Sequence, residues 1–435
     1  MFGLGKYGNG IGLHRARRFF DDAHIPHDYF AERSIVVTGS NGKGSTTRMI
    51  YGLLQTQFAQ VGCFISPHLI DVTERFEISG QQITPAELHT YKDRVLAFNA
   101  SLPDGDFMGA FELLFYVAVQ WFYARQADVI VWEAGIGGRY DPTRSLAAPI
   151  SALTSLDLEH TELLGATREL IAYDKLDVTR PNGESVISSS VDPALYERLR
   201  AYAAVSGKTF HFIADHYQIT ALARLDGQQQ ITVQAHDGSF PTDGLTIPLQ
   251  LLGQHQAENA LTALDVTRRF LARHQRQLPP AEIVGALPKV TWPGRLEQIS
   301  RQPNVWIDVG HTPDAITRVI EELLQRYSAQ QMTVVYGVSY NKSAQQITAL
   351  IETHFERVIL TRAYKNGTPL QLLADTFSAP HKIIAQFDTV EGAAAYARDG
   401  GDDPHSVIVV LGGLFLAIEF KVAFAGDDPQ ALNFF

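Results

Sequence analysis

Cysteine is almost absent from this chain of 435 residues, since Cys63 is the only one. A single cysteine excludes an internal disulfide framework and favours a reducing compartment, so we expect a cytoplasmic protein. Basic residues are also scarce, with 36 against 47 acidic residues, and the net charge is −11. A chain of this charge has no general attraction for nucleic acid, so we expect no nucleic-acid partner.

Long apolar runs are missing as well. The most apolar run, at 407–418, has twelve residues and contains two glycines. It is too short to span a bilayer and predicts a buried strand that enters a helix. The N-terminal stretch 1–20 lacks the continuous apolar core of a signal peptide. We therefore expect no membrane partner and an ordinary globular protein, with 45% hydrophobic and 19% charged residues.

The chain does contain a glycine-rich loop between an apolar strand and a helix, "VVTGSNGKGSTTRM" at 36–49. Glycines let the backbone turn tightly and aim its N–H groups at one point, and the helix N-terminus that follows attracts anions. Lys43 adds a positive charge, and Ser45 or Thr46 adds a hydroxyl for a metal ion. The spacing is G-x-x-G-K, two residues shorter than the common phosphate loop. We interpret it as a nucleoside triphosphate site, with an ordinary glycine-rich turn as the alternative.

The order of the other segments predicts an α/β protein. Apolar strands at 34–39, 61–66, 128–135 and 150–156 alternate with helices, which predicts a parallel sheet with helices on its faces. Short alternating runs from 209 to 251 predict antiparallel hairpins appended to that sheet.

The last third of the chain predicts a second open α/β domain, with five strands and intervening helices. The proline-containing stretch "LPKVTWPGR" places a boundary near residue 293, between an N-terminal domain at 1–292 and a C-terminal domain at 293–435. Ligands of such sheets bind beyond the carboxyl ends of the strands, so we expect the site in a cleft between the two domains.

Polar residues follow several of the predicted strands. Ser66 comes after the second strand, Glu133 ends an otherwise apolar strand, and His160 follows the next one. Mg²⁺ prefers hydroxyl, carboxylate and phosphate oxygens, so Ser66, Glu133 and a triphosphate could form its shell, with His160 at a second metal. As alternatives, Glu133 could pair with Arg139, and His160 could be a hydrogen-bonded structural residue.

Three charged residues near His160 also have two interpretations. Lys175 lies in a charged helical stretch and could be functional or a solvated surface residue. Asp157 and Glu159 could belong to the site or cap the helix that follows them.

Taken in order, these motifs resemble the folylpolyglutamate synthase/dihydrofolate synthase family, within the Mur-ligase superfamily of ATP-dependent amide ligases. The resemblance runs from about Gly12 to Glu419. It is carried by "TGSNGKGST", "SPHLIDVTERFEISGQQI", "FELLFYVAVQWF", "WEAGIGGR", "HTELLGATRELIAYDK", "LLGQHQAENALTAL", "WPGRLE" and "VLGGLFLAIE". It implies a Mur-ligase-like P-loop ATPase central domain with an appended antiparallel region, and a C-terminal Rossmann-like α/β domain.

The resemblance also implies roles for single residues. Those at ATP-binding positions are Gly42, Lys43, Gly44, Ser45, Thr46, Asn259, Arg295, Asp308 and His311. Those at the positions that bind magnesium, in two sites, are Ser45, Ser66, Glu133, His160 and Lys175, the lysine being carbamylated. The catalytic residues are Lys43, His160 and Lys175. The residues on the acceptor-substrate side are Phe111, Glu112, Arg139, Tyr140 and Asp141.

The chain also departs from the family pattern. "TNGKGS" becomes "SNGKGS", "GGRLDATN" becomes "GGRYDPTR", "EKAGI" becomes "DKLDV", and "DGAHNP" becomes "DVGHTP". The residues for ATP are therefore retained, whereas the acceptor pocket, which Tyr140 and Arg144 border, is altered.

The resemblance implies an ATP-dependent acid–amino-acid ligase of one-carbon metabolism that forms an amide in two steps. A carboxylate attacks the γ-phosphate of ATP, and the amino group of glutamate then displaces phosphate from the acyl phosphate. The partners are a small carboxylic acid and an amino acid, and we expect a monomer. Three interpretations stay open: a folate ligase, a ligase for another acid, motivated by "GGRYDPTR", and a nucleotide-binding protein without turnover. Retention of Ser66, Glu133, His160 and Lys175 argues against the last.

Overall fold

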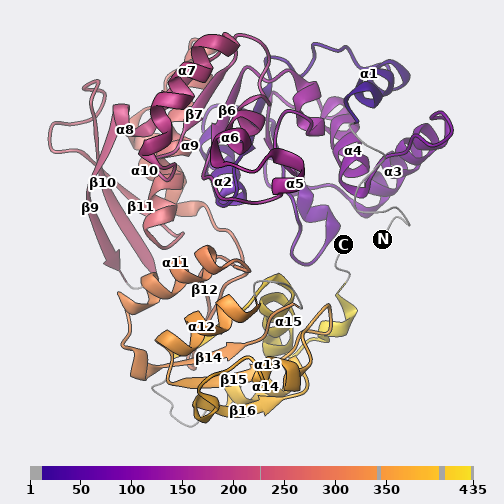
Figure 1. The fold of residues 1–435 in the computed structure, drawn as a ribbon. Coiled ribbons are helices and arrows are strands. Elements are labelled where there is room, and N and C mark those ends of the chain that lie inside the picture. Colours follow the sequence, from indigo (N-terminus) through magenta and orange to yellow (C-terminus); the bar gives the residue numbers. More distant parts are fainter. Residues whose placement is uncertain (1–11, 226, 340–343, 401–406, 433–435) are drawn as a thin grey trace.

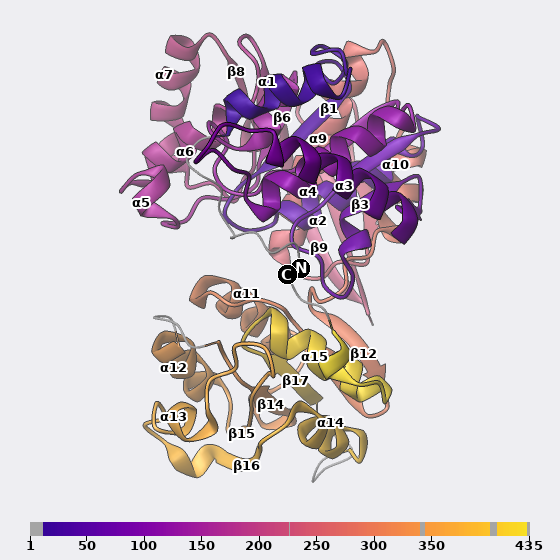
Figure 2. The same ribbon diagram turned by 90° about the vertical axis from the view of Figure 1, so that its right-hand side faces the viewer.

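The computed structural model describes residues 12–225, 227–339, 344–400 and 407–432. Three sheets organise these residues into two α/β units that lie one above the other (Figure 1, Figure 2). We call the part with the first two sheets the N-terminal unit and the part with the third sheet the C-terminal unit. The stretch 290–296, between the last short helix of one and the first strand of the other, connects them.

The main sheet of the N-terminal unit has eight strands in the order β4-β3-β2-β5-β1-β6-β7-β8. The strands β2, β5, β1, β6, β7 and β8 pair in parallel, each with the next. Strands β3 and β4 extend the sheet beyond β2 by antiparallel pairing. The strands are β1 (Ser34–Thr38), β2 (Val61–Phe64), β3 (Phe76–Ile78), β4 (Gln81–Gln82), β5 (Val129–Glu133), β6 (Ile150–Leu153), β7 (Glu184–Ile187) and β8 (Thr209–Phe212). The four predicted apolar strands are confirmed as β1, β2, β5 and β6, which are neighbours in the sheet.

Helices cover both faces of this sheet. Successive residues of a strand point to opposite faces, so Val129 and Val131 of β5 pack in one apolar cluster, with α2 and α9, whereas Ile130 and Trp132 pack in another, with α1, α3 and α4. The helices of this unit are α1 (Leu13–Asp22), α2 (Lys43–Leu54), α3 (Pro85–Ala100), α4 (Ala110–Ala124), α5 (Thr161–Leu164), α6 (Arg168–Leu176), α7 (Tyr196–Ser206), α8 (Ile213–His216), α9 (Gln254–Arg273) and α10 (Pro280–Ala286).

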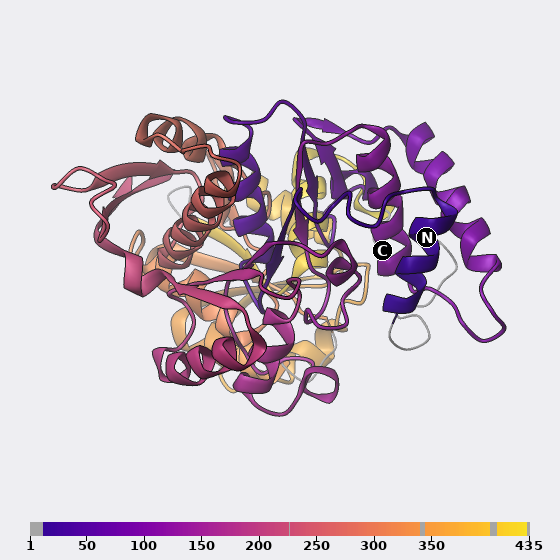
Figure 3. The ribbon, with the colours of Figure 1, turned by 90° about the horizontal axis from the view of Figure 1, so that it is seen from above.

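A three-stranded antiparallel sheet of β9 (Tyr217–Leu225), β10 (Gln228–Ala235) and β11 (Leu245–Leu249) is appended to this unit. It lies at the opposite end of the unit from α3 (Figure 3). The antiparallel region was predicted from 209, but residues 209–212 instead form β8, which pairs in parallel with β7. As the edge strand of the main sheet, β8 is only partly buried, and it therefore lacks the apolar run typical of a buried parallel strand.

The sheet of the C-terminal unit has six strands in the order β12-β13-β17-β14-β15-β16. The five predicted strands are confirmed and pair in parallel, whereas β12, antiparallel to β13, was missed. The sequence of β12, "EQISR", is half-buried and has no apolar run to reveal it. The strands are β12 (Glu297–Arg301), β13 (Asn304–Ile307), β14 (Met332–Tyr336), β15 (Arg357–Thr361), β16 (Ile383–Phe387) and β17 (Val407–Leu411). The helices are α11 (Pro313–Leu324), α12 (Ala344–His354), α13 (Leu370–Ala374), α14 (Val390–Arg398) and α15 (Leu414–Ala425).

Two views at right angles show α11 on the side of the C-terminal unit that faces the N-terminal unit (Figure 1, Figure 2). Among the helices of the described residues, none combines the length and the apolar character that a membrane crossing needs.

Candidate active site

The phosphate loop connects the end of β1 to the start of α2. Gly39 and Gly42 have φ angles of 141° and 83°, which side-chain-bearing residues rarely adopt. A Cβ at Gly42 would also lie 2.7 Å from Oδ1 of Asn259, so the loop and α9 approach closely. The backbone N–H groups of Ser40 and Asn41 donate to the carbonyl and the hydroxyl of Ser155, at 3.0 and 2.8 Å. The loop is thus held against the residues that follow β6, with the N-terminus of α2 directed at the site.

Lys43, the first residue of α2, folds back over this loop. Its ammonium donates to the carbonyl oxygens of Gly39 and Ser40, at 2.8 and 3.3 Å. Thr46, on the next turn, is fully buried, and its hydroxyl has no hydrogen-bond partner within the described part of the chain. Buried polar atoms are nearly always satisfied, so this orphan hydroxyl fits a position that a bound ligand completes.

Glu133, at the end of β5, is buried beside the loop after β2. Its carboxylate accepts from the backbone N–H of Ser66 at 3.0 Å. Burial raises the pKa of Glu133, and the positive charge of Lys43 opposes that rise. Arg139, the alternative partner of Glu133, instead donates to Asp177 at 2.8 Å. Glu133 is therefore a buried acid near Lys43, and a cation beside it would be stabilising.

Lys175 lies inside the protein, and its interpretation as a solvated surface residue is wrong. The side chain is 2% exposed, and its ammonium donates to Glu159 at 3.0 Å. Burial, reinforced by the positive charge of Lys43, lowers the pKa of Lys175 below the ordinary lysine value. Asp157 accepts from the Asn41 amide at 2.7 Å. Asp157 and Glu159 thus contact residues of the site rather than cap α5, whose N-cap residue is His160.

His160 is exposed and has a φ angle of 47°, in the left-handed region. Its role as a metal ligand stays a prediction. In the described residues, no group of three or more His, Cys, Asp and Glu side chains could hold a metal ion. A magnesium ion in this cleft would therefore depend on hydroxyl and phosphate oxygens as well as on Glu133.

The connecting stretch contributes Arg295, and the C-terminal unit contributes Asp308 and His311. Asp308 is buried and accepts from the backbone N–H groups of Leu296 and Gly310, at 2.8 and 2.7 Å. Burial raises the pKa of the Asp308 carboxyl, and the charge of Arg295 opposes this rise. Burial lowers the pKa of His311. The positive charges of Arg295 and Lys43 lower this pKa further, and the negative charge of Glu159 opposes the change.

A cleft of about 50 Å³ lies between the two units and holds residues from both. Of the predicted ATP-binding residues, it is lined by Gly42, Ser45, Asn259, Arg295 and Asp308. Sequence reasoning missed Asn41, Thr154, Ser155, Ser190, His255, Gln256, Asp314, Ala315, Arg318 and Val319. The motif around Asn259 contained a signal for two of them, since His255 and Gln256 precede Asn259 by one helical turn.

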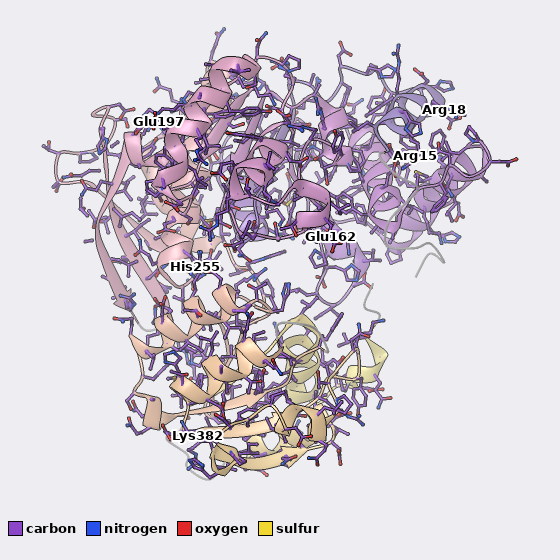
Figure 4. The ribbon with its side chains drawn as sticks, viewed as in Figure 1. Arg15, Arg18, Glu162, Glu197, His255 and Lys382 are labelled. Carbon is purple, nitrogen blue, oxygen red and sulfur yellow. The ribbon has the colours of Figure 1, made fainter. Side chains whose placement is uncertain are left out.

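His255 begins α9 on the side of the N-terminal unit that faces the C-terminal unit (Figure 4). Its pKa is lowered to about 3, mainly by burial and further by the positive charges of Arg318 and Arg295. The imidazole is thus neutral at physiological pH. A larger hollow of about 710 Å³ lies between α2, the β3–β4 turn and the stretch that follows α10, and none of the predicted site residues lines it.

The five residues predicted for the acceptor substrate differ in burial: three of them are at least partly exposed, and two are buried. The ring of Phe111 lies against Gly135, Tyr140 is 49% exposed, and Arg139 is bound by Asp177. Glu112 and Asp141, by contrast, are buried and have structural partners.

Glu112 accepts from Nε and Nη2 of Arg15, both at 2.9 Å, and Asp141 accepts from the backbone N–H groups of Gly135, Ile136 and Thr143. Contact of either acid with substrate stays a prediction.

The chain is similar to known ligases over nearly its whole length. The model of the Mur ligase glutamate ligase domain matches residues 294–414. A dihydrofolate synthase/folylpolyglutamate synthase of Mycobacterium tuberculosis is 30% identical, over 91% of this chain and 87% of the relative. A folylpolyglutamate synthase of Lacticaseibacillus casei is 31% identical, over 91% of this chain and 90% of the relative.

Solved structures of such ligases share the fold. The M. tuberculosis folylpolyglutamate synthase complexed with ADP aligns with a TM-score of 0.83 and 25% identity, over 98% of this chain and 97% of that one. A folylpolyglutamate synthase complex with AMPPCP and folate aligns with a TM-score of 0.80 and 25% identity, over 96% of this chain and 95% of that one.

Proposed function

Because the chain belongs to the folylpolyglutamate synthase/dihydrofolate synthase family of ATP-dependent glutamate ligases, we propose that it couples glutamate to a folate-type acid through an acyl phosphate. The observation that carries this proposal is the cleft, in which the phosphate loop of one unit faces Arg295 and Asp308 of the other. The relatives are named as folylpolyglutamate and dihydrofolate synthases, and one similar structure contains both AMPPCP and folate.

In the first step, a carboxylate oxygen of the acid attacks the γ-phosphorus of ATP and ADP leaves. The N–H groups at the start of α2 bind the phosphates, since they have no partner within the helix. Lys43 neutralises charge on the phosphoryl group in transfer, and Arg295 adds positive charge from the opposite wall. The enzyme supplies mainly positioning and electrostatic stabilisation in this step.

In the second step, the amino group of glutamate attacks the carbonyl carbon of the acyl phosphate. The C–N bond forms as the C–O bond to phosphate breaks, and the attacking nitrogen loses a proton, which the departing phosphate accepts. No side chain of the protein becomes attached to substrate. The buried setting of the cleft keeps water away from the acyl phosphate, which would otherwise be hydrolysed.

The residues around the phosphate loop fit one magnesium ion. Glu133 is a buried acid whose pKa is raised, the Thr46 hydroxyl is an orphan within the described part of the chain, and Ser66 lies beside Glu133. Ser45, Ser66 and Glu133 would hold the ion, which neutralises phosphate charge when bound. A second ion at His160 and Lys175 rests on the family resemblance alone.

Lys175 fits the carbamate that the family resemblance implies. An amine reacts with CO₂ only when it is neutral, and burial lowers the pKa of this lysine. Asp174 and Glu159 act in the opposite direction, but the pKa remains below the ordinary value. Asp177, the other acid of the altered flank, is engaged by Arg139, Tyr202 and Lys208. The carbamate would add a negative charge that binds cations in the cleft.

The acceptor acid is tested by measuring ADP release with purified protein, ATP and Mg²⁺. Dihydropteroate, tetrahydrofolate and unrelated aromatic acids are compared, each with glutamate, aspartate or no amino acid. We expect ADP release only with a pteroyl acid and glutamate, and a product heavier by one glutamyl residue. Turnover with a non-pteroyl acid alone would assign the enzyme to another substrate, whereas the absence of all turnover would leave a nucleotide-binding protein.

A further inference from the structure

Helix α11 carries a line of charges that the mechanism above does not use. Asp314, Arg318, Glu322 and Arg326 recur at intervals of four residues, which places the first three along one face of the helix and Arg326 in the turn that follows it. Asp314 pairs with Arg318 at 3.1 Å, and Glu322 pairs with Arg326 at 3.0 Å. Apolar residues of α11, such as Ile320, pack into the core of the C-terminal unit. The charged face is therefore available for contact with the N-terminal unit.

The far end of this charged face docks on the antiparallel sheet. Glu322 is 3% exposed and accepts from Nε and Nη2 of Arg224, each at 3.0 Å. Arg326 donates to the carbonyl of Leu225 at 3.1 Å. Arg224 and Leu225 end β9, so these bonds join the two units at the point where β9 approaches α11 (Figure 1). A two-pronged guanidinium–carboxylate pair fixes both distance and angle, unlike a single hydrogen bond.

The near end of the same face lies in the nucleotide cleft. Asp314 and Arg318 line that cleft together with Gly42 and Asn259. Glu322 is one turn further along a rigid helix, and four residues span only about 6 Å. A shift of α11 at Glu322 is therefore transmitted to Arg318 with little loss.

We propose that Glu322 is a positioning residue for the nucleotide: by binding Arg224 of the antiparallel sheet, it holds α11 so that Asp314 and Arg318 face the nucleotide. This inference rests on the proposed function only for the identity of the ligand, an adenine nucleotide. It gives the appended sheet a function, because β9 then fixes the position of one wall of the cleft.

The test compares Glu322→Gln, Arg224→Gln and the double variant with the parent protein. We expect the Kd for AMPPCP, measured by calorimetry, to rise about tenfold in each single variant. The double variant should be no worse than either single one, because both changes break the same bond. In turnover, the KM for ATP should rise while kcat changes less than about twofold, since the reacting groups lie on other elements.

Lys421→Gln is the matched control, because its ion pair with Glu297, at 2.7 Å, is confined to the C-terminal unit. It should leave the Kd unchanged. An unchanged Kd in folded Arg224→Gln protein, whose side chain is 30% exposed and tolerant of change, would overturn the proposal. So would a Kd that rises equally in Lys421→Gln. Because AMPPCP binding needs no acid substrate, a failure of the proposed acid specificity would leave this result interpretable.

Discussion

The residues that the N-terminal unit places in the cleft lie in the phosphate loop, after β6 and β7, and near the starts of α2 and α9. Those of the opposite wall lie in the connecting stretch, directly after β13 and on α11. Lys43 begins α2, Glu133 ends β5 and Lys175 lies in the last turn of α6, so all three belong to the N-terminal unit. Arg295, Asp308 and Arg318 line the cleft only while the two units are docked. We infer that the N-terminal unit supplies most of the groups for the chemistry and that the opposite wall, apart from the charge of Arg295, controls nucleotide affinity.

The largest expected effect comes from removing the charge of the N-terminal wall. Lys43→Ala should lower kcat by about 10³ or more, because the proposed phosphate loop loses its fixed positive charge. The fold should survive, which the unfolding midpoint checks. Lys289→Ala is the control, since this exposed lysine lies outside the cleft. Turnover by folded Lys43→Ala protein at the parent rate would refute the phosphate-loop assignment.

Lys175→Ala removes a second charged side chain of the N-terminal unit and tests whether that lysine is carbamylated. If Lys175 is carbamylated, the variant loses a carboxylate, and kcat should fall by about 10². Formate or acetate should restore part of the activity by taking the place of the carbamate. Lys43→Ala is the matched control, because a carboxylate cannot replace an ammonium. Two results together would show that Lys175 acts as a plain amine. The first is that formate and acetate rescue neither variant, and the second is that the intact mass of rapidly trapped protein lacks the carbamate.

Glu112→Gln separates a structural acid from a substrate-binding one. Glu112 is paired with the buried Arg15, so the variant should lose about 2–3 kcal/mol of unfolding free energy, measured with urea. The KM for the acid substrate should change less than about twofold. Arg18→Gln is the control: Arg18 lies on the exposed side of α1, the helix that carries Arg15 (Figure 4), and this variant should change neither stability nor KM. A raised KM with unchanged stability would return Glu112 to the substrate site.

The smallest expected effect comes from Arg318→Gln, which tests whether the two walls of the cleft are docked in solution. The Arg318 charge helps to lower the pKa of His255 to about 3, so Arg318→Gln should raise that pKa, as followed by NMR titration of the ring. His255 is protonated more readily in the unfolded chain, so its contribution to stability is complete above about pH 6.5 and is lost as the pH falls toward 3. The variant should therefore lose less stability on acidification. An unchanged His255 pKa would indicate that Arg318 lies far from it in solution.

Much of the fold followed from the sequence because buried parallel strands produce apolar runs. β1, β2, β5 and β6 were predicted for this reason, as were five strands of the C-terminal unit. β7, β8 and β12 were not predicted. β8 and β12 are edge strands that keep polar residues, and β7 lies inside the sheet, but its sequence "ESVI" is too short and too polar to form an apolar run.

Site residues could be predicted from the sequence where a single motif contains the residues that identify it. The glycines and lysine of the phosphate loop are of this kind. The pairing of Arg139 with Asp177 was not, because it joins residues 38 apart in the chain. The burial of Lys175 was hidden for a similar reason: its charged neighbours are typical of a surface helix, and Gly138, whose missing Cβ lets the turn approach α6, lies in a different motif.

An isotope experiment tests the acyl phosphate mechanism most directly. The acid substrate is labelled with heavy oxygen in its reacting carboxylate and incubated with ATP, Mg²⁺ and glutamate, and the released phosphate is analysed by mass spectrometry. An acyl phosphate transfers one carboxylate oxygen to phosphate when the amine attacks, so the account predicts one heavy oxygen in each phosphate formed. Unlabelled phosphate, released at the same rate as ADP, would contradict it.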